Sequence, residues 1–191
     1  MRYVLVFDTE TTGLTSEDTV CQLAAAKLDA ETLEVSDTFE SLIDPQRPIN
    51  AGATKIHGIT DADVAGQPLL SDVMASGFSS WLRRADYWAG HNLQFDIRML
   101  KDHIAHPYPT VLDTYFLSRS LFKRWSNHRL QTAVKELGLD GGKAHDALSD
   151  VLACAQLLRV IADGRPVSEL CADYNSYVQR SKAAAMQLLQ R

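Results

Sequence analysis

The chain has 191 residues, 46% of them hydrophobic, which is enough to build one well-buried domain. Its formal charge of -5, from 24 acids and 19 bases, argues against an extended basic surface that grips long nucleic acid, although nucleic acid stays open as a substrate. Cys21, Cys154 and Cys171 are scattered without CxxC pairing, so we expect reduced thiols. Because neither a signal pattern nor a membrane-length apolar run occurs, we also expect a soluble, cytoplasmic protein without membrane contact.

The N-terminal part of the chain has the pattern of β-strands. Residues 2–7 are continuously apolar, which indicates a strand buried on both faces, and residues 11–13 are expected to end it. Residues 19–28 and 33–43 are rich in strand-forming side chains, and polar residues 29–32 join them. These segments predict an antiparallel meander.

The next segment changes from strand to helix. Pro45 and Pro48 break the strand pattern, and we expect a polar loop as far as Thr60, a candidate helix N-cap. The apolar spacing after Pro68 predicts a helix through Leu82, and residues 87–89 predict a short strand.

The C-terminal part of the chain is predominantly helical in pattern. Helices are predicted over residues 95–104, 114–122, 128–137 and 147–161, with Asn127 capping the third and Gly138 ending it. We therefore expect one domain over residues 1–165 and a helical tail over 166–191, packed on the domain or extending from it. Strands first, followed by helices interleaved with a strand or two, predict an α/β fold in which helices flank a mixed sheet.

Two acids follow the first strand with a spacing that puts them on one face. Side chains at positions i and i+2 of a strand project to the same side, so Asp8 and Glu10 lie together. Unless a positive charge lies between them, burial and like charge favour protonation of one carboxylate, whereas a hard cation such as Mg²⁺ prefers oxygen ligands of this kind. The alternative is that both acids are solvated residues of a turn.

A second acidic motif occurs in the segment HNLQFD, where the strand at residues 87–89 turns into a helix. Asp96 falls in the first helical turn, where a carboxylate also interacts favourably with the helix dipole without any metal. Asn92 lies in the preceding loop and suits a turn equally well.

The third motif is HDALSD, which follows a glycine-rich loop. If Asp146 is the helix N-cap, His145 belongs to the loop and is free to lie over a site into which Asp150 points from the helix. The alternatives are a surface loop histidine and a solvated helical acid. We adopt the capping role for Asp146.

The three motifs, taken together and in this order, resemble the DEDDh family of 3′-5′ exonucleases. The segments DTETTGL, LIDPQRPINAGATKIHGITD and HDALSD are most similar to the proofreading exonuclease subunit of bacterial replicative DNA polymerase and its stand-alone relatives. The resemblance covers residues 2–162. It implies an RNase H-like fold, with a five-stranded mixed β-sheet flanked by α-helices.

The resemblance also implies the chemistry of the site. Asp8, Glu10, Asp96 and Asp150 would bind two Mg²⁺ or Mn²⁺ ions, and His145 would act as the general base. Four carboxylates and two divalent ions balance in charge, so a site that repels itself when empty becomes neutral when loaded. A histidine with a pKa near about 6.5 accepts a proton from water at neutral pH. Hydrolysis would release nucleoside 5′-monophosphates.

Substrate contacts are expected by the same resemblance at the residues after the DxE motif and in the HGIT loop. The candidates are Thr11, Gly13, Leu14, His57 and Asn92. Leu14 either wedges against the last base or is an ordinary core leucine. The basic segment 123–129, with Trp125 as a stacking residue, is a further candidate, against the alternative of a solvated helix junction.

The partners expected are single-stranded or frayed 3′ ends, chiefly of DNA, and a DNA polymerase is a possible further partner. RNA or oligoribonucleotide trimming is the alternative within this chemistry, and a nucleic-acid-binding module without catalysis is another. The opening VFDTETTG also resembles haloacid dehalogenase-type phosphatases. The phosphatase mechanism requires an aspartate at the position of Glu10, and the phosphatase interpretation gives no role to Asp96, His145 and Asp150.

Overall fold

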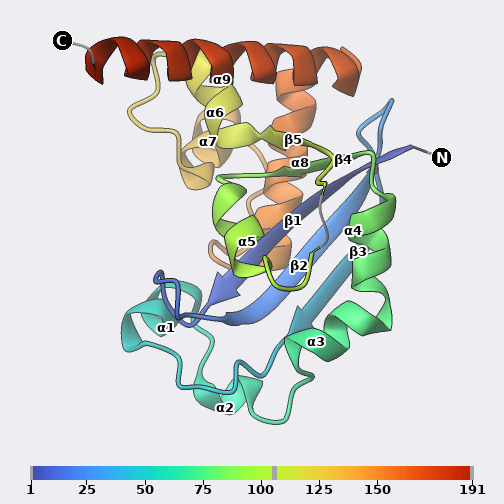
Figure 1. The fold of residues 1–191 in the computed structure, drawn as a ribbon, viewed down its shortest axis with the longest axis vertical. Helices are drawn as coiled ribbons and strands as arrows, with labels where there is room; N and C mark the ends of the chain where they lie inside the picture. The colour runs from blue at the N-terminus through green and yellow to red at the C-terminus, as the bar shows by residue number, and fades with distance from the viewer. Residues whose placement is uncertain (1, 105–106, 190–191) are drawn as a thin grey trace.

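The computed structural model describes residues 2–104 and 107–180 in full, and the backbone of residues 181–189. Within these residues, five strands form one mixed sheet in the order β3-β2-β1-β4-β5, with helices on both faces (Figure 1). The strands are β1 (Tyr3–Thr11), β2 (Val20–Asp29), β3 (Val35–Leu42), β4 (Tyr87–Gly90) and β5 (Thr110–Asp113). The helices are α1 (Ala51–His57), α2 (Asp61–Val64), α3 (Leu70–Val73), the π-helical turn η1 (Met74–Phe78), α4 (Ser79–Arg84), α5 (Gln94–Met99), α6 (Thr114–Leu121), α7 (Leu130–Leu137), α8 (Ala147–Ala162) and α9 (Val167–Leu189).

The sheet combines a meander with parallel strands. β1, β2 and β3 pair antiparallel, whereas β4 pairs parallel with both β1 and β5. The carboxyl ends of β1, β4 and β5 therefore lie at one edge of the sheet, so residues that leave these strands are brought together. The predicted α/β fold with an RNase H-like, five-stranded mixed sheet is confirmed.

β1 is the central strand and is buried on both faces, as its apolar run predicts. Val4, Leu5 and Val6 are completely buried, with successive side chains entering opposite halves of the core. The strand continues beyond the apolar residues 2–7 to Thr11, the first of the residues expected to end it. Asp8 and Glu10 consequently belong to the strand itself, on the same face as Val4 and Val6.

The two faces of the sheet have different helices. α8 packs against β1 and β2 on the face to which Asp8 points, together with α6, α7 and the start of α9. The apolar residues of α3, η1, α4 and α5 cover the other face. The helix predicted from residue 147 is confirmed, and the Asp146 side chain caps it by accepting the backbone N–H of Ser149.

Several local predictions were wrong, among them the helix expected over residues 95–104, which ends at Met99. The helix expected through Leu82 is interrupted by η1, because Gly77 has a φ of 141°, outside the helical region. The segment before Thr60, expected as a loop, contains α1, which Asn50 caps through the N–H of Gly52. Asn127 is not the N-cap of the third C-terminal helix: α7 begins at Leu130 after Arg129, and the Asn127 side chain accepts the N–H of Arg129.

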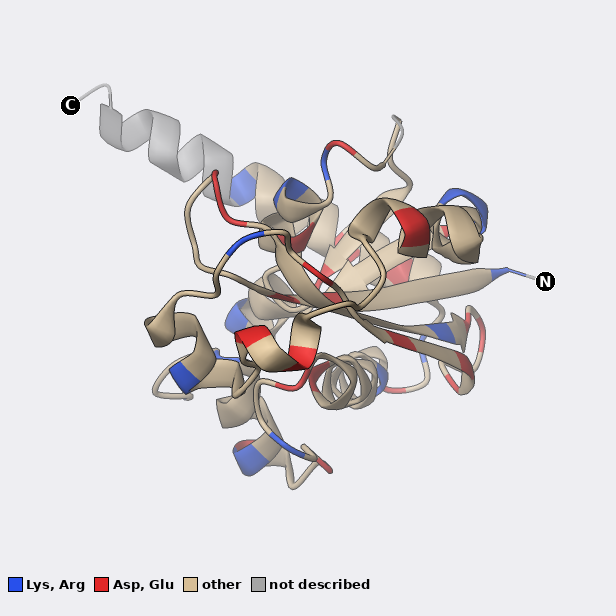
Figure 2. Cartoon of the chain, turned by 90° about the horizontal axis from the view of Figure 1, so that it is seen from below, with Lys and Arg blue, Asp and Glu red and all other residues tan. Residues whose placement is uncertain are grey.

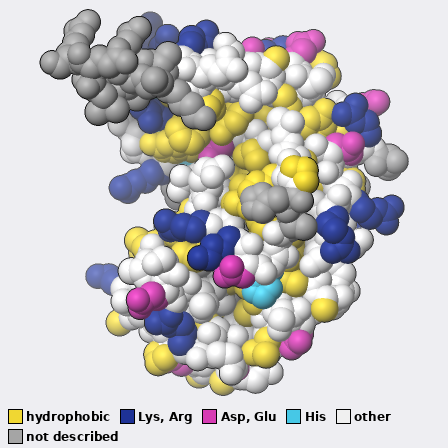
Figure 3. Space-filling model, viewed as in Figure 1, with side chains coloured by type: hydrophobic (Ala, Val, Ile, Leu, Met, Phe, Trp, Pro, Cys, Tyr) yellow, Lys and Arg dark blue, Asp and Glu magenta, His cyan; other side chains and the backbone are white. Residues whose placement is uncertain are grey.

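The helix α9 begins by packing on the body of the protein. Val167, Leu170 and Cys171 are buried in the same core as α8, and Tyr174 and Tyr177 contact the ring of Phe116. Apolar side chains gather along the border between α9 and the body (Figure 3). The division into residues 1–165 and a 166–191 tail stays a prediction, and residues 190–191 lie outside those described. Over the part of the chain that is described, no helix has the length and hydropathy to cross a membrane.

Candidate active site

Four acids from three separate elements meet at the carboxyl-terminal edge of the sheet. Asp8 and Glu10 come from β1, Asp96 from the first turn of α5, and Asp150 from the first turn of α8. Each is near enough to others to raise a neighbour's pKa: Asp96, Glu10 and Asp150 all raise that of Asp8. The structure thus brings together the four predicted acids, and the alternative of dispersed, solvated carboxylates is wrong.

His145 lies at the open side of this cluster. Its ring nitrogen and the carboxylate oxygens of Glu10 and Asp150 lie within 4.8 Å of one another, a spacing compatible with a shared cation. The residue is exposed, and its φ of 58° places it in the left-handed region. It therefore belongs to the turn before α8, as the capping role of Asp146 predicts.

The pKa values of the two β1 acids are raised strongly. Burial is the largest cause for Asp8, whose pKa lies well above its usual range, followed by repulsion from the neighbouring carboxylates. Burial also raises the pKa of Glu10 to about 8, with Asp150 and Asp96 as the next causes. At neutral pH, these groups ionise fully only if a positive charge compensates them.

The other two acids are buried and hydrogen-bonded. Burial raises the pKa of Asp96 to about 7, although its Oδ1 accepts the backbone N–H of Thr9 at 2.9 Å and the Thr9 hydroxyl at 2.7 Å. Burial likewise raises the pKa of Asp150 to about 6, while the charge of His145 lowers it. Hydrogen bonds thus hold both carboxylates in place.

The donor set suits a hard divalent cation. Oxygen ligands from four carboxylates are what Mg²⁺ and Mn²⁺ prefer, and a cation would offset the burial that raises all four pKa values and the carboxylate repulsion that adds to it at Asp8 and Glu10. The residues present therefore fit the predicted metal site.

Asp113, at the end of β5, holds the segment that carries Asp96. Its completely buried carboxylate accepts the backbone N–H groups of Asn92 at 2.9 Å and Leu93 at 3.0 Å, and it caps α6 through Tyr115. Burial raises its pKa to about 6. Asp113 was not among the predicted site residues, because its only local signal is an acid at the end of an unrecognised strand.

Gln22 ties the start of α8 to the sheet. It lies opposite Glu10 in the pairing of β2 with β1, and its Oε1 accepts the backbone N–H of Ala147 at 3.2 Å. Its Nε2 donates to Asp146 at 3.4 Å and to Glu40 at 2.9 Å. This buried amide was also missed, because its role depends entirely on tertiary contacts.

A pocket of about 590 Å³ opens beside the acids. Four of the five predicted substrate residues line it, namely Thr11, Gly13, Leu14 and His57. The other lining residues are Thr9, Glu10, Asn50, Gly52, Ala53, Ile56, Phe95 and His145. The fifth, Asn92, is not among them: it makes a left-handed turn, with a φ of 68°, and donates its N–H to Asp113.

Two of these residues have clear structural positions. Leu14 is 75% exposed, which excludes the alternative that it is a core leucine. His57 is buried, with Nδ1 accepting the N–H of Ile59 at 3.0 Å, so Nε2 carries the proton and donates to the carbonyl of Thr11 at 3.3 Å. Both ring nitrogens of His57 are thus occupied, which leaves the ring itself to shape the pocket.

Basic side chains do not form a continuous stripe over the described residues. Lys and Arg lie on separate elements in Figure 2 and in separate groups on the face in Figure 3. Trp125, expected as a stacking residue, is itself stacked on Phe122 with ring centroids 4.2 Å apart. One face of its ring is therefore already covered.

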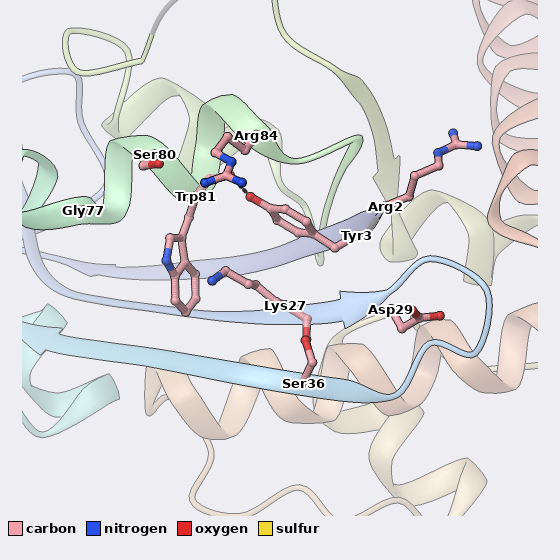
Figure 4. Close-up of a pocket in the computed structure, with 9 residues that line it drawn as sticks. All are labelled: Arg2, Tyr3, Lys27, Asp29, Ser36, Gly77, Ser80, Trp81 and Arg84. Atoms are coloured by element: carbon pink, nitrogen blue, oxygen red, sulfur yellow. Dashed lines mark hydrogen bonds between the residues drawn. The ribbon is translucent and has the colours of Figure 1, made fainter.

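A second cavity, of about 470 Å³, contains none of the four acids (Figure 4). Its lining includes Lys27, whose ammonium lies 3.5 Å from the ring centroid of Trp81 and 3.1 Å from Asp37. Arg2, at its edge, pairs with Asp86 at 3.3 Å and points away from the other side chains in Figure 4. These two cations already have partners, so we place the active site at the acidic cluster.

Comparison with known proteins gives a family match and several relatives. The family described as Exonuclease (RNase_T) matches residues 5–158. The PolC-type DNA polymerase III of Bacillus subtilis is 35% identical over 161 residues, 81% of this chain and 11% of that protein. A DNA polymerase III subunit epsilon-like protein of Rhodobacter capsulatus is 35% identical over 163 residues, 80% of this chain and 22% of that protein. The chain thus spans a small part of the length of these relatives.

Solved structures agree with this match. Exonuclease X in complex with 5′ overhanging duplex DNA superposes with a TM-score of 0.73 at 26% identity, over 90% of this chain and 98% of that chain. E. coli Exonuclease I in complex with a dA16 oligonucleotide has a TM-score of 0.77 at 21% identity, over 90% of this chain and 42% of that chain. At 21% identity, the likeness to Exonuclease I shows a shared fold only.

Proposed function

Because this chain belongs to the exonuclease (RNase_T) family, we propose that it is a 3′-5′ exonuclease that releases nucleoside 5′-monophosphates from nucleic-acid 3′ ends, those of DNA first. The observation that carries this proposal is a cluster of four carboxylates, three of which raise the pKa of the fourth, Asp8, beside His145 and an open pocket. A binding module without catalysis would have no need of a buried, self-repelling site of this kind.

We assign the metal ligands to Asp8, Glu10, Asp96 and Asp150, with two Mg²⁺ or Mn²⁺ ions as the cofactor. When bound, such ions activate a water molecule and stabilise the charge that develops on the phosphate and the leaving oxygen. The chain itself supplies the fixed carboxylates: Thr9 orients Asp96 by two hydrogen bonds. Little rearrangement is then needed when cations bind.

His145 is the proposed general base. It is exposed on the loop before α8 and close to both Glu10 and Asp150, so its ring nitrogen can reach a water molecule held beside them. Imidazole as a class takes up a proton near neutral pH, which suits it to this role. Removing the imidazole should lower the rate by about 10²-fold or more and leave the carboxylates in place.

The pocket beside the acids is proposed to hold the terminal nucleotide. Exposed Leu14 and Ile56, together with Phe95, give it apolar surface against which a base can pack. Thr11, Gly13, His57 and Asn92 remain candidates for binding or for shaping the pocket. Since basic side chains form no stripe over the described residues, we expect contact with only a few nucleotides of a single-stranded or frayed end.

DNA is favoured over RNA by the relatives. The relatives are named as a DNA polymerase III and as a DNA polymerase III subunit epsilon-like protein, and Exonuclease X was solved with 5′ overhanging duplex DNA. A DNA polymerase is a proposed partner on the same grounds, in a proofreading role. Buried free thiols at Cys21, Cys154 and Cys171 support a reducing, cytoplasmic location.

The test uses DNA and RNA oligonucleotides of one sequence, labelled at either end, incubated with Mg²⁺ or with EDTA. A 5′-labelled strand should shorten stepwise and a 3′-labelled strand should release a labelled mononucleotide at once, in Mg²⁺ only. Asp8→Ala and His145→Ala should be nearly inactive, whereas Asp102→Asn, which alters an exposed acid outside the cluster, should behave as the wild type. Full activity of Asp8→Ala would overturn the assigned site, and internal cuts would overturn the exonuclease assignment.

A further inference from the structure

Gln131 is a side chain outside the four acids that contacts one of them directly. It lies at the second position of α7, and its Nε2 donates to Oδ1 of Asp150 at 3.1 Å. The other carboxylate oxygen, Oδ2, accepts the backbone N–H of His145 at 3.2 Å. Each oxygen of Asp150 thus has a donor, which fixes the plane of the carboxylate.

The position of Gln131 is itself anchored to the segment that carries Asp96. Nε2 of His91 donates to the carbonyl oxygen of His128 at 2.8 Å, and His91 lies directly after β4, just before Asn92. The Ser118 hydroxyl meets the ring of His128 at 3.2 Å. The start of α7 is therefore tied both to α6 and to the loop that precedes α5, so the donor of Gln131 is held in place rather than left on a free surface.

We propose that Gln131 is a positioning residue that holds the Asp150 carboxylate in the orientation needed to bind the divalent cation. This inference rests on the proposed function for its metal, but it concerns a residue that touches neither the metal nor the substrate. A carboxylate with a free torsion must be ordered when a cation binds, and the amide has already ordered it. A neutral donor also avoids adding a charge, as a lysine at the same position would.

The direct test is metal binding without nucleic acid. Mn²⁺ is titrated by calorimetry into the wild type and into Gln131→Met, which keeps the length of the side chain but removes the donor. We expect the Kd for Mn²⁺ of the variant to be about 10-fold higher or more, because removing a side chain that supports a metal ligand typically weakens metal binding by about 10- to 100-fold. The matched control is Gln156→Met, because the Gln156 amide donates to the carbonyl oxygen of Asp140 at 2.9 Å and accepts its N–H at 3.1 Å without touching a site carboxylate.

A kinetic measurement separates positioning from general damage. If Gln131 acts through metal binding, the Mg²⁺ concentration for half-maximal activity rises in parallel with the Kd, and kcat at saturating Mg²⁺ returns to within about fivefold of the wild type. A Kd within about twofold of the wild type, or a kcat lowered equally at all Mg²⁺ concentrations, would overturn the proposal. Should circular dichroism show that Gln131→Met does not fold, Gln131→Asn provides the same test, since it keeps an amide but is one methylene too short.

These measurements distinguish the inference from the function on which it rests. If the wild type binds Mn²⁺ but leaves every 3′ end intact, the proposed exonuclease activity is wrong, while the comparison of Kd values still tests Gln131. If the wild type degrades 3′ ends and Gln131→Met binds Mn²⁺ as tightly, only the role of Gln131 is wrong.

Discussion

Replacing Asp96 by asparagine should stabilise the metal-free protein while it abolishes activity. Asp96 is 3% exposed, and its Oδ1 accepts two hydrogen bonds from Thr9, at 2.9 and 2.7 Å. An asparagine Oδ1 accepts the same two bonds, so the packing and the hydrogen bonds survive. What changes is the negative charge, which is needed to bind a cation and is unfavourable without one.

The size of the effect follows from the raised pKa. Burial moves the pKa of Asp96 from 3.8 to about 7, a difference of about 3 units, and one unit corresponds to about 1.36 kcal/mol, so the penalty reaches about 4 kcal/mol. Because the folded-state pKa is the higher one, this carboxyl favours folding fully below about pH 4, and the contribution is lost as the pH rises through about 7. The Asp96→Asn variant lacks this one contribution to the pH dependence of stability. Allowing for the burial of an amide, we expect the free energy of unfolding to rise by about 2 to 4 kcal/mol at pH 8 and by half of that or less at pH 5.

Urea unfolding in EDTA at pH 8 and pH 5 measures this difference, with Asp102→Asn as the matched control. For a chain of this length, the predicted gain corresponds to an increase of roughly 4 to 16 °C in Tm at pH 8. Saturating Mg²⁺ should reduce the advantage of the variant, because only the wild type has the complete ligand set. A variant that is less stable than the wild type in EDTA, by the same amount at both pH values, would show that an uncompensated buried charge does not dominate the stability of this site.

Three further outcomes are expected. Because Leu14 is 75% exposed at the pocket, Leu14→Ala should raise KM for oligonucleotides about 10-fold in steady-state kinetics and leave the free energy of unfolding within about 0.5 kcal/mol of the wild type. An unchanged KM would show that Leu14 does not belong to the binding surface. Gly13→Ala should lower the free energy of unfolding by about 1 to 3 kcal/mol in urea denaturation, since a Cβ at this position would lie 2.6 Å from Oδ2 of Asp18. An unchanged free energy of unfolding would show that the turn can shift to accommodate the Cβ. In fluorescence melts, Mg²⁺ should raise the wild-type Tm more at pH 8 than at pH 5, because protons compete with the cation at Glu10, whose pKa is raised to about 8. An equal rise in Tm at both pH values would indicate that Mg²⁺ binds elsewhere.

Short-range rules predicted the local positions of Asp8, Glu10 and Asp150, whereas the meeting of all four acids in one site was expected from the family resemblance. The i, i+2 relation on a strand places Asp8 with Glu10, and this holds although β1 is longer than expected. The N-cap preference of aspartate identifies Asp146, which leaves His145 in the loop and sends Asp150 into the site.

The parts that could not be predicted depend on tertiary contacts or on short elements. β5 has only four residues, Thr110–Asp113, directly after Pro109, so its apolar content is too small to separate it from a loop. α1 has seven residues and little helical periodicity, and its helix is held by the Asn50 cap. The side chains that support the acids could not be predicted for a different reason. Gln131 is 19 residues away from Asp150 in the sequence, and no local pattern indicates that the two side chains are hydrogen-bonded.

The proposed function requires that Asp8, Glu10, Asp96 and Asp150 share divalent cations. Anomalous scattering at the manganese edge from crystals grown with Mn²⁺ tests this most directly. We expect strong peaks enclosed by these four carboxylates, and their loss in Asp96→Asn crystals. An empty cluster at saturating Mn²⁺, or manganese bound only elsewhere on the chain, would contradict it.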